Sequence, residues 1–308
     1  MRPTVARSIL VATDLGPTSD AVLGAAGALA AAQGAALHVV HALDLTGTPY
    51  AGAAGGDRTF PGRVAQAERM LAEQVARTVP AGVEVGTREV VIYEPHKAIR
   101  DRAAAAAADL VVLGPHRRRR LADAFLGSTA HRLIRSTEAP CLVGRAELAL
   151  PLRRIVVPLD LSELARGALD AALSWGGALG GGEAGPSAAR VDVVHVVPRY
   201  LEDGDSPFDR SAIGPELRRE VEEAMRRHPE PGWEVRVELV SGDSPAEEIV
   251  SYAGREGADL LVLATHGHGA AQRALVGSVA SAVARTATVP VLLVPPSLWR
   301  NPPAEHGA

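Results

Sequence analysis

The chain has 308 residues, a formal net charge of −4 and only 3% aromatic residues. This length suits about two domains of ~150 residues each, and so small a charge gives no general attraction to nucleic acid or anionic membranes. No apolar run approaches the ~20 residues of a membrane helix, the first residues lack the pattern of a signal peptide, and the single cysteine excludes an intrachain disulfide. We therefore expect a cytoplasmic protein without nucleic-acid or membrane partners.

Short apolar runs alternate with helical patterns along the first half of the chain. The runs predict strands over Ile9–Thr13, Leu37–Ala42, Glu84–Ile92, Asp109–Leu113 and Cys141–Val143. Between them we expect a loop over Leu45–Pro61 and four helices. The first two helices cover Thr18–Gln33 and Arg63–Thr78, the third opens at Pro95, and the fourth covers Leu126–Ser136. In the helix over Arg63–Thr78, the Gln, Glu and Arg side chains are expected to face outward. The apolar setting of Cys141 favours a packed, unreactive thiol.

The second half of the chain repeats the first. Three pairs of matching residues are separated by the same interval: Asp109 and Asp259, Gly127 and Gly277, Pro140 and Pro290. Its strands are expected near Ile155, Val193, Val235, Leu261 and Val291. Self-similarity of this kind indicates a duplicated domain. We predict one domain over residues 1–147, a second over 148–298, and a tail over 299–308.

Strands that are apolar throughout and alternate with helices indicate a parallel sheet covered on both faces. The predicted fold class is therefore α/β, with two tandem doubly wound, Rossmann-like domains, each with a five-stranded, mainly parallel sheet. Ligands of such sheets bind beyond the carboxyl ends of the strands, where the strand order reverses. This rule directs attention to the residues that follow the first and fourth strands of each half.

A candidate phosphate site follows the fourth strand of the second half. Gly267 can adopt a positive φ and let the backbone approach a ligand closely. Gly277 and Ser278 open a helix, whose N-terminal N–H groups attract anions. A tight turn followed by an ordinary helix cap explains the same residues without a ligand. Because Lys97 is the only lysine, a Gly-Lys-Ser/Thr phosphate loop is absent and a P-loop NTPase is excluded.

Over the full length of both halves, this constellation resembles the universal stress protein family. The hallmark of that family is Gly-x2-Gly-x9-Gly-Ser/Thr after strand four, with an aspartate closing strand one. The second half departs from it only at Ala264. The resemblance implies an adenine nucleotide surrounded by Pro158, Leu159, Asp160, Val196, Leu263, Ala264, Gly267, Gly277, Ser278, Val279 and Ala280.

The first half departs further from the family pattern, because Arg117 stands where the second glycine is expected. The resemblance therefore implies a weaker site here, formed by Ala12, Thr13, Asp14, Ala42, Gly114, Arg117, Gly127, Ser128 and Thr129. The run of four arginines at 117–120 fits two interpretations. It could hold phosphates through charge-assisted hydrogen bonds, or it could be a solvated basic loop.

Many members of the family bind ATP, and others are nucleotide-free. The resemblance implies a regulatory or stress-response protein that binds ATP or a related adenine nucleotide, with or without Mg²⁺, mainly in the second domain. It also implies an intrachain pseudo-dimer formed through the last strands, with a homo-oligomer left open. Two alternative hypotheses remain open. One is a slow ATPase or phosphotransferase that uses the same pocket, and the other is a nucleotide-free interaction scaffold.

The histidines of the chain point to no catalytic or metal site. His116, His266 and His268 have no further ligands at a recognisable spacing, so no metal site is predicted. His41 and His195, in the second strand of each half, are expected to pack in the core or near the ligand. No catalytic residue is predicted, and at most weak ATP hydrolysis is expected.

Overall fold

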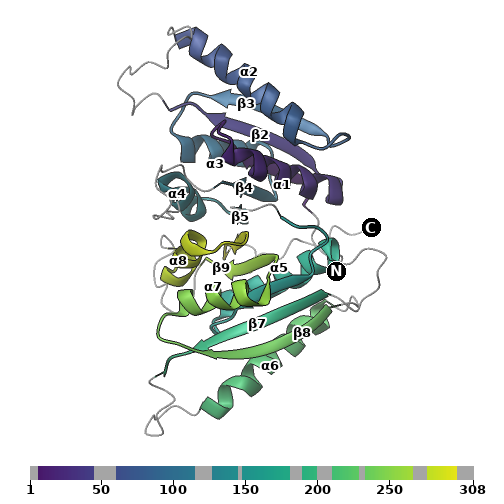
Figure 1. Cartoon of the computed structure of the whole chain (residues 1–308), viewed down its shortest axis with the longest axis vertical. Coiled ribbons are helices and arrows are strands. Elements are labelled where there is room, and N and C mark those ends of the chain that lie inside the picture. Colours follow the sequence, from purple (N-terminus) through teal and green to yellow (C-terminus); the bar gives the residue numbers. More distant parts are fainter. Residues whose placement is uncertain are drawn as a thin grey trace. The chain divides into compact units, whose positions relative to one another are not determined.

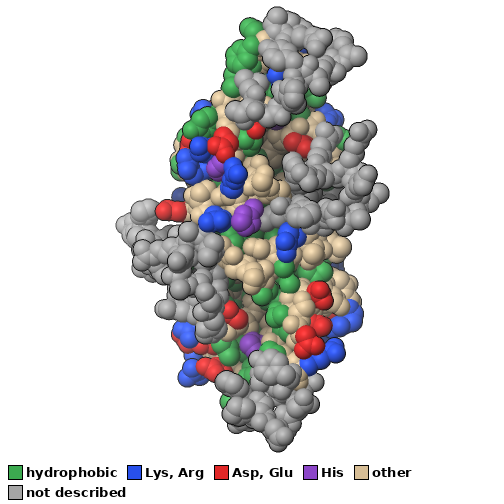
Figure 2. Space-filling view, turned by 90° about the vertical axis from the view of Figure 1, so that its left-hand side faces the viewer, with side chains coloured by type: hydrophobic (Ala, Val, Ile, Leu, Met, Phe, Trp, Pro, Cys, Tyr) green, Lys and Arg blue, Asp and Glu red, His purple; other side chains and the backbone are tan. Residues whose placement is uncertain are grey.

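The computed structural model describes residues 6–44, 60–114, 127–144, 148–180, 189–199, 210–228, 233–265 and 276–296. These residues fall into two compact units, which we call the first unit (within 6–144) and the second unit (within 148–296) (Figure 1). Each is described by itself. In the face of the molecule shown in Figure 2, acidic and basic side chains are intermixed, in keeping with the small formal charge.

The first unit is a parallel sheet of five strands in the order β3-β2-β1-β4-β5. Helix α1 packs beside α2, and α3 packs beside α4. The strand order reverses between β1 and β4, which is the switch point of a doubly wound sheet. The elements are β1 Ser8–Ala12, α1 Thr18–Gln33, β2 Ala36–Ala42, α2 Phe60–Thr78, β3 Val85–Val91, α3 Pro95–Ala105, β4 Leu110–Leu113, α4 Ser128–Ser136 and β5 Cys141–Val143.

The second unit repeats this topology, with parallel strands in the order β10-β9-β6-β7-β8 and the switch point between β6 and β9. The predicted fold class, two repeated α/β domains with parallel sheets, is confirmed. The elements are β6 Arg154–Pro158, α5 Glu163–Leu179, β7 Ala189–Val197, α6 Arg210–Arg227, β8 Trp233–Ser241, α7 Pro245–Glu256, β9 Leu260–Ala264, α8 Ser278–Thr286 and β10 Val291–Val294.

The cores are aliphatic, as the shortage of aromatic residues requires. Every side chain of β4, β5 and β10 is buried, because helices cover both faces of these strands. In the described part of the chain, no helix is both long enough and apolar enough to span a membrane.

Several predicted boundaries differ from the structure. Helix α2 begins at Phe60, inside the predicted loop, because Pro61 in the first helical turn needs no hydrogen-bond partner for its nitrogen. Helix α4 begins at Ser128 after Gly127 as its N-cap, whereas the prediction began at Leu126, which lies outside the described residues. Strands β1 and β3 differ from their predicted spans by one residue at each end.

The thiol of Cys141 should not react in the folded protein. Only 1% of the residue is exposed, and burial raises its pKa to about 12, so the nucleophilic thiolate is scarce at neutral pH. We expect no alkylation by iodoacetamide in native buffer and complete alkylation in guanidinium, measured by intact mass. Rapid labelling of the folded protein would contradict this prediction.

Candidate functional site

A strained turn follows the first strand of the second unit. Pro158 ends β6, Leu159 is buried, and Asp160 is exposed at the carboxyl edge of the sheet. Leu161 has a φ of 60°, a left-handed conformation that costs a non-glycine residue about 1–2 kcal/mol. A turn of this kind persists only when neighbouring contacts hold it in place.

Hydrogen bonds hold the turn before and after Leu161. Before it, the Leu159 amide donates to the Val194 carbonyl at 2.9 Å, and the Leu159 carbonyl lies 2.7 Å from Nδ1 of His195. After it, the Ser162 amide donates to Oδ1 of Asp160 at 3.0 Å. Ser162 is also the N-cap of α5, since its Oγ accepts from the Ala165 amide at 3.2 Å. The Asp160 side chain therefore stabilises the turn in which it lies.

The end of β9 is tied to the start of α8, although residues 266–275 between them lie outside the described chain. The Gly277 amide donates to the Thr265 carbonyl at 2.7 Å, and the Thr265 amide donates to the Val294 carbonyl at 2.9 Å. Thr265 itself is only 2% exposed. The N-terminus of α8 is thereby fixed at the same carboxyl edge of the sheet as β9.

The first turn of α8 presents backbone N–H groups at the N-terminus of a helix. Gly277 is the N-cap and has no side chain that could cap the helix, and the Ser281 amide makes the first bond back to its carbonyl at 2.9 Å. The N–H groups of Ser278, Val279 and Ala280 precede that bond, so they have no partner within the helix. Their partial positive charge favours an anion, and the exposed Ser278 adds a hydroxyl.

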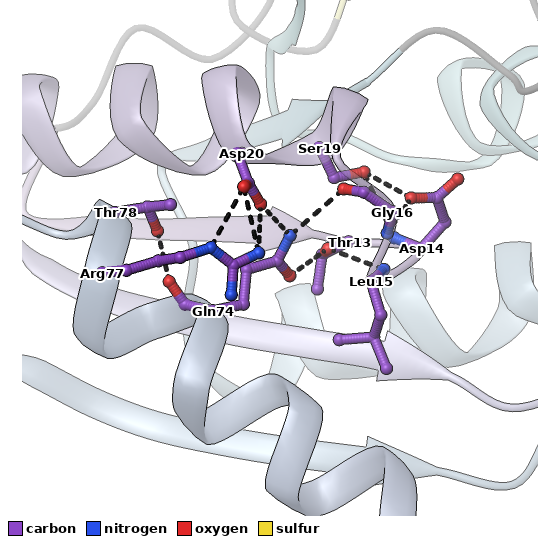
Figure 3. Close-up of polar contacts among 9 residues, drawn as sticks. All are labelled: Thr13, Asp14, Leu15, Gly16, Ser19, Asp20, Gln74, Arg77 and Thr78. Atoms are coloured by element: carbon purple, nitrogen blue, oxygen red, sulfur yellow. Dashed lines mark hydrogen bonds and ion pairs between the residues drawn. The ribbon is translucent and has the colours of Figure 1, made fainter.

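The first unit repeats the strained turn but holds its aspartate differently. Leu15 also has a φ of 60°, and Oδ1 of Asp14 accepts from the Gly16 amide at 2.8 Å (Figure 3). In addition, the Ser19 hydroxyl donates to Oδ1 of Asp14 at 2.6 Å. The second unit has Ala165 at the position equivalent to Ser19, so no hydroxyl from that position reaches its aspartate.

A buried glutamine connects this turn to helix α2, which corrects the prediction that the polar side chains of α2 face outward. Gln74 is 1% exposed, and its Nε2 donates to Oδ1 of Asp20 at 2.6 Å and to the Gly16 carbonyl at 3.3 Å. Its Oε1 accepts from the Thr13 hydroxyl at 2.7 Å, and Arg77 pairs with Asp20 at 2.8 Å (Figure 3). The amide can be buried because both of its ends are paired.

The second unit has an ion pair where the first has the glutamine. Nη2 of Arg166 donates to Oε1 of Glu220 at 2.6 Å, and Glu220 is 6% exposed. Arg166 follows Asp160 by the same number of positions as Asp20 follows Asp14. The first two helices of each unit, α1 and α2 in the first and α5 and α6 in the second, are therefore connected by different polar side chains.

The predicted site residues of the second unit lie at the carboxyl edge of its sheet, apart from Gly267, which is outside the described residues. They come from the end of β6, the end of β7, the end of β9 and the first turn of α8. Leu263 is only 4% exposed, so it offers little surface to a ligand. In the first unit, Arg117 lies outside the described residues. The other predicted residues end or directly follow β1, β2 and β4, or lie at the start of α4: Ala12, Thr13, Asp14, Ala42, Gly114, Gly127, Ser128 and Thr129.

Sequence reasoning missed the polar residues behind the site. Among the residues that the structure describes, no three His, Cys, Asp or Glu side chains are grouped so as to hold a metal ion. His116, His266 and His268 are outside that part of the chain. Gln74, Glu220 and the imidazole contacts had no spacing signal, because each depends on a partner far away in the sequence.

The family model for the universal stress protein family matches residues 6–145 and again residues 151–295. The chain therefore belongs to the universal stress protein family and contains two copies of its domain. A curated relative, universal stress protein MJ0531 of Methanocaldococcus jannaschii, is 39% identical over 82 residues, which is 25% of this chain and 48% of the relative. The chain thus spans about half the length of the curated relative it matches.

Two solved structures share the fold over nearly the whole chain. A universal stress protein from Archaeoglobus fulgidus has a TM-score of 0.65 at 20% identity and covers 96% of this chain and 97% of its own. The functionally unknown protein PA1789 from Pseudomonas aeruginosa has a TM-score of 0.64 at 19% identity, covering 96% and 94% respectively. At sequence identities this low, the similarity shows that the fold is shared and nothing more.

Removing the Asp20 carboxylate should destabilise the protein in a pH-dependent manner. Burial raises the pKa of Asp20, but hydrogen bonds from Gln74 and Arg77 outweigh it and hold the pKa below its ordinary value. A lowered folded-state pKa stabilises the protein above the unfolded value of ~3.9, and this stabilisation disappears as the pH falls through the folded-state pKa. Asp20→Asn should therefore lower the calorimetric unfolding temperature at pH 7, and the difference from wild type should shrink toward pH 3.

The matched control is Asp101→Asn, which removes an exposed carboxylate 2.7 Å from Arg100. Exposed pairs of this kind contribute little, so its unfolding temperature should stay near wild type. An Asp20→Asn deficit of equal size at both pH values would contradict the assignment.

Proposed function

We propose that this protein binds ATP or a related adenine nucleotide in its second unit and has a regulatory role in stress response. The observation that carries the proposal is the first turn of α8, which is capped by Gly277, bonded to the end of β9 and without a capping side chain. Membership of the universal stress protein family supports it further.

Each part of the site suits one part of a nucleotide. The N–H groups of Ser278, Val279 and Ala280, with the Ser278 hydroxyl, would hold phosphate oxygens. The Asp160 carboxylate would accept hydrogen bonds from ribose hydroxyls. The backbone beside Leu159 would border adenine, together with the carboxyl end of β7 at Val196. A Mg²⁺ ion would take its ligands mainly from phosphates and water, as this cation usually does.

The second unit is the better candidate of the two. Its motif keeps the family glycine at Gly267, where the first unit has Arg117. Both units keep the aspartate in the same strained turn, Asp14 before Leu15 and Asp160 before Leu161, so the ranking depends on this loop position.

The site suits binding rather than catalysis. Helix-end amides and a hydroxyl contact phosphates in the ground state and in the transition state alike, and such uniform binding does not raise the chemical rate. Phosphate release from ATP should therefore be far below the ordinary enzyme range of roughly 1–1000 per second. A steady-state release assay measures this rate, and turnover within the ordinary range would overturn the proposal that the protein is a binding protein.

Isothermal titration of ATP into nucleotide-free protein tests the proposal. We expect about one strong site per chain, and Asp160→Ala should weaken it about 10- to 100-fold, as expected for loss of a charged hydrogen bond. Asp14→Ala makes the same change in the first unit and should leave the strong site intact. Ser278→Ala should be milder, about 2- to 12-fold. Two equal sites, or equal losses in both aspartate variants, would contradict the ranking of the units.

A second pair of variants exchanges the loops of the two units. Gly267→Arg makes the second loop imitate the first and should abolish most ATP binding, because a long side chain would enter the space needed by the phosphates. Arg117→Gly restores the family pattern in the first unit and should create or improve a second site. Undiminished binding in Gly267→Arg would exclude this loop as the phosphate cradle. A wild-type chain that carries no nucleotide when purified and binds none would favour the scaffold alternative.

A further inference from the structure

The same imidazole contact occurs in both units. Nδ1 of His195, on β7, lies 2.7 Å from the Leu159 carbonyl oxygen, and Nδ1 of His41, on β2, lies 2.9 Å from the Thr13 carbonyl oxygen. A carbonyl oxygen can only accept a hydrogen bond, so Nδ1 must donate in each case. In the neutral ring, the proton is therefore on Nδ1 and Nε2 is the acceptor.

The contact depends on the backbone rather than on the neighbouring side chains. The accepting residue is Thr13 in one unit and Leu159 in the other, and the polar groups behind the turn are a glutamine in one and an ion pair in the other. These surroundings differ, yet both histidines bind the carbonyl that directly precedes the loop aspartate. Packing of the ring in an apolar core does not require such a bond.

In the second unit, the contact joins two segments of the proposed nucleotide site. His195 directly precedes Val196 near the end of β7, and its ring binds the carbonyl that directly precedes Asp160. The Leu159 amide is bonded to β7 as well, at the Val194 carbonyl. Both backbone groups of Leu159 are therefore attached to β7 just before the left-handed residue Leu161.

We propose that His195 is a positioning residue for the nucleotide, which holds Asp160 at a fixed place beside the end of β7 by donating from Nδ1. This inference rests on the proposed function. A turn that contains a left-handed leucine needs such a restraint, and a site held in its binding conformation loses less entropy when the ligand arrives. His41 has the same relation to Asp14 in the first unit.

Three variants test the proposal by titration with ATP. His195→Leu removes the donor and should weaken ATP binding about 10-fold, within the range expected for one lost hydrogen bond. His195→Asn keeps an N–H donor near the position of Nδ1 and should restore most of the affinity. His228→Leu is the matched control, because His228 is also half-buried in the second unit and bonds Asp170 at 3.1 Å near the end of α6. The His228→Leu variant should bind ATP with the affinity of the wild-type protein.

Wild-type affinity in His195→Leu would overturn the proposal. So would equal losses in His195→Leu and His195→Asn, since the shape of the ring rather than its donor would then matter. If His195→Leu fails to fold, titration of His195→Asn and the NMR measurement on the wild-type protein described next still decide.

Two further measurements need no nucleotide. Nitrogen-15 NMR of the ring in mildly alkaline buffer should show a protonated Nδ1 and an unprotonated Nε2 for His195, and the opposite tautomer would refute the proposal. Amide exchange at Ser162, which binds Asp160, should be at least about fivefold faster in His195→Leu. Unchanged exchange would show that the ring does not hold the turn. If wild-type protein binds no ATP, the proposed function fails, while these two results still settle what His195 holds.

Discussion

Because helices cover both faces of the central strands, the side chains of those strands must be apolar, and polar groups gather where the strands end. The side chains of Leu110–Leu113, in the central strand β4, are buried throughout, so they can carry structure but offer nothing to a ligand. The candidate site of the second unit is therefore formed where β6, β7 and β9 end and where α8 begins. The position of the candidate site follows from this constraint, because the carboxyl ends of parallel strands lie at one edge of the sheet.

The two units share the backbone turn after the first strand but differ in the polar side chains that surround it. Both units keep the aspartate after the first strand, the left-handed leucine that follows it and the histidine that binds the preceding carbonyl. They differ where helices one and two meet, with Asp20 and Gln74 in the first unit and Arg166 and Glu220 in the second. A shared backbone turn therefore tolerates exchange of its supporting side chains, and the buried Gln74 amide and the buried Glu220 carboxylate each have a partner on the neighbouring helix.

A charged cluster in the second unit illustrates the same rule away from the site. Asp192 is fully buried in β7, where Nη2 of Arg190 donates to it at 2.8 Å and to Glu256 at 3.0 Å. The pKa of the Tyr252 hydroxyl nearby is raised by burial and then by these carboxylates. A carboxylate within an apolar strand is tolerated because an arginine next to it supplies the compensating charge.

The sequence by itself determined the duplication and the parallel α/β fold, and it predicts the edge of the sheet at which a ligand would bind. Strand and helix patterns are local, so they could be predicted from neighbouring residues, and element ends such as Phe60 shifted by only a few positions. Only the tertiary structure decided that Gln74 is buried and that His195 binds the Leu159 carbonyl. Those partners are far apart in the sequence, and the spacing of residues along a chain does not reveal which distant backbone group a side chain will meet.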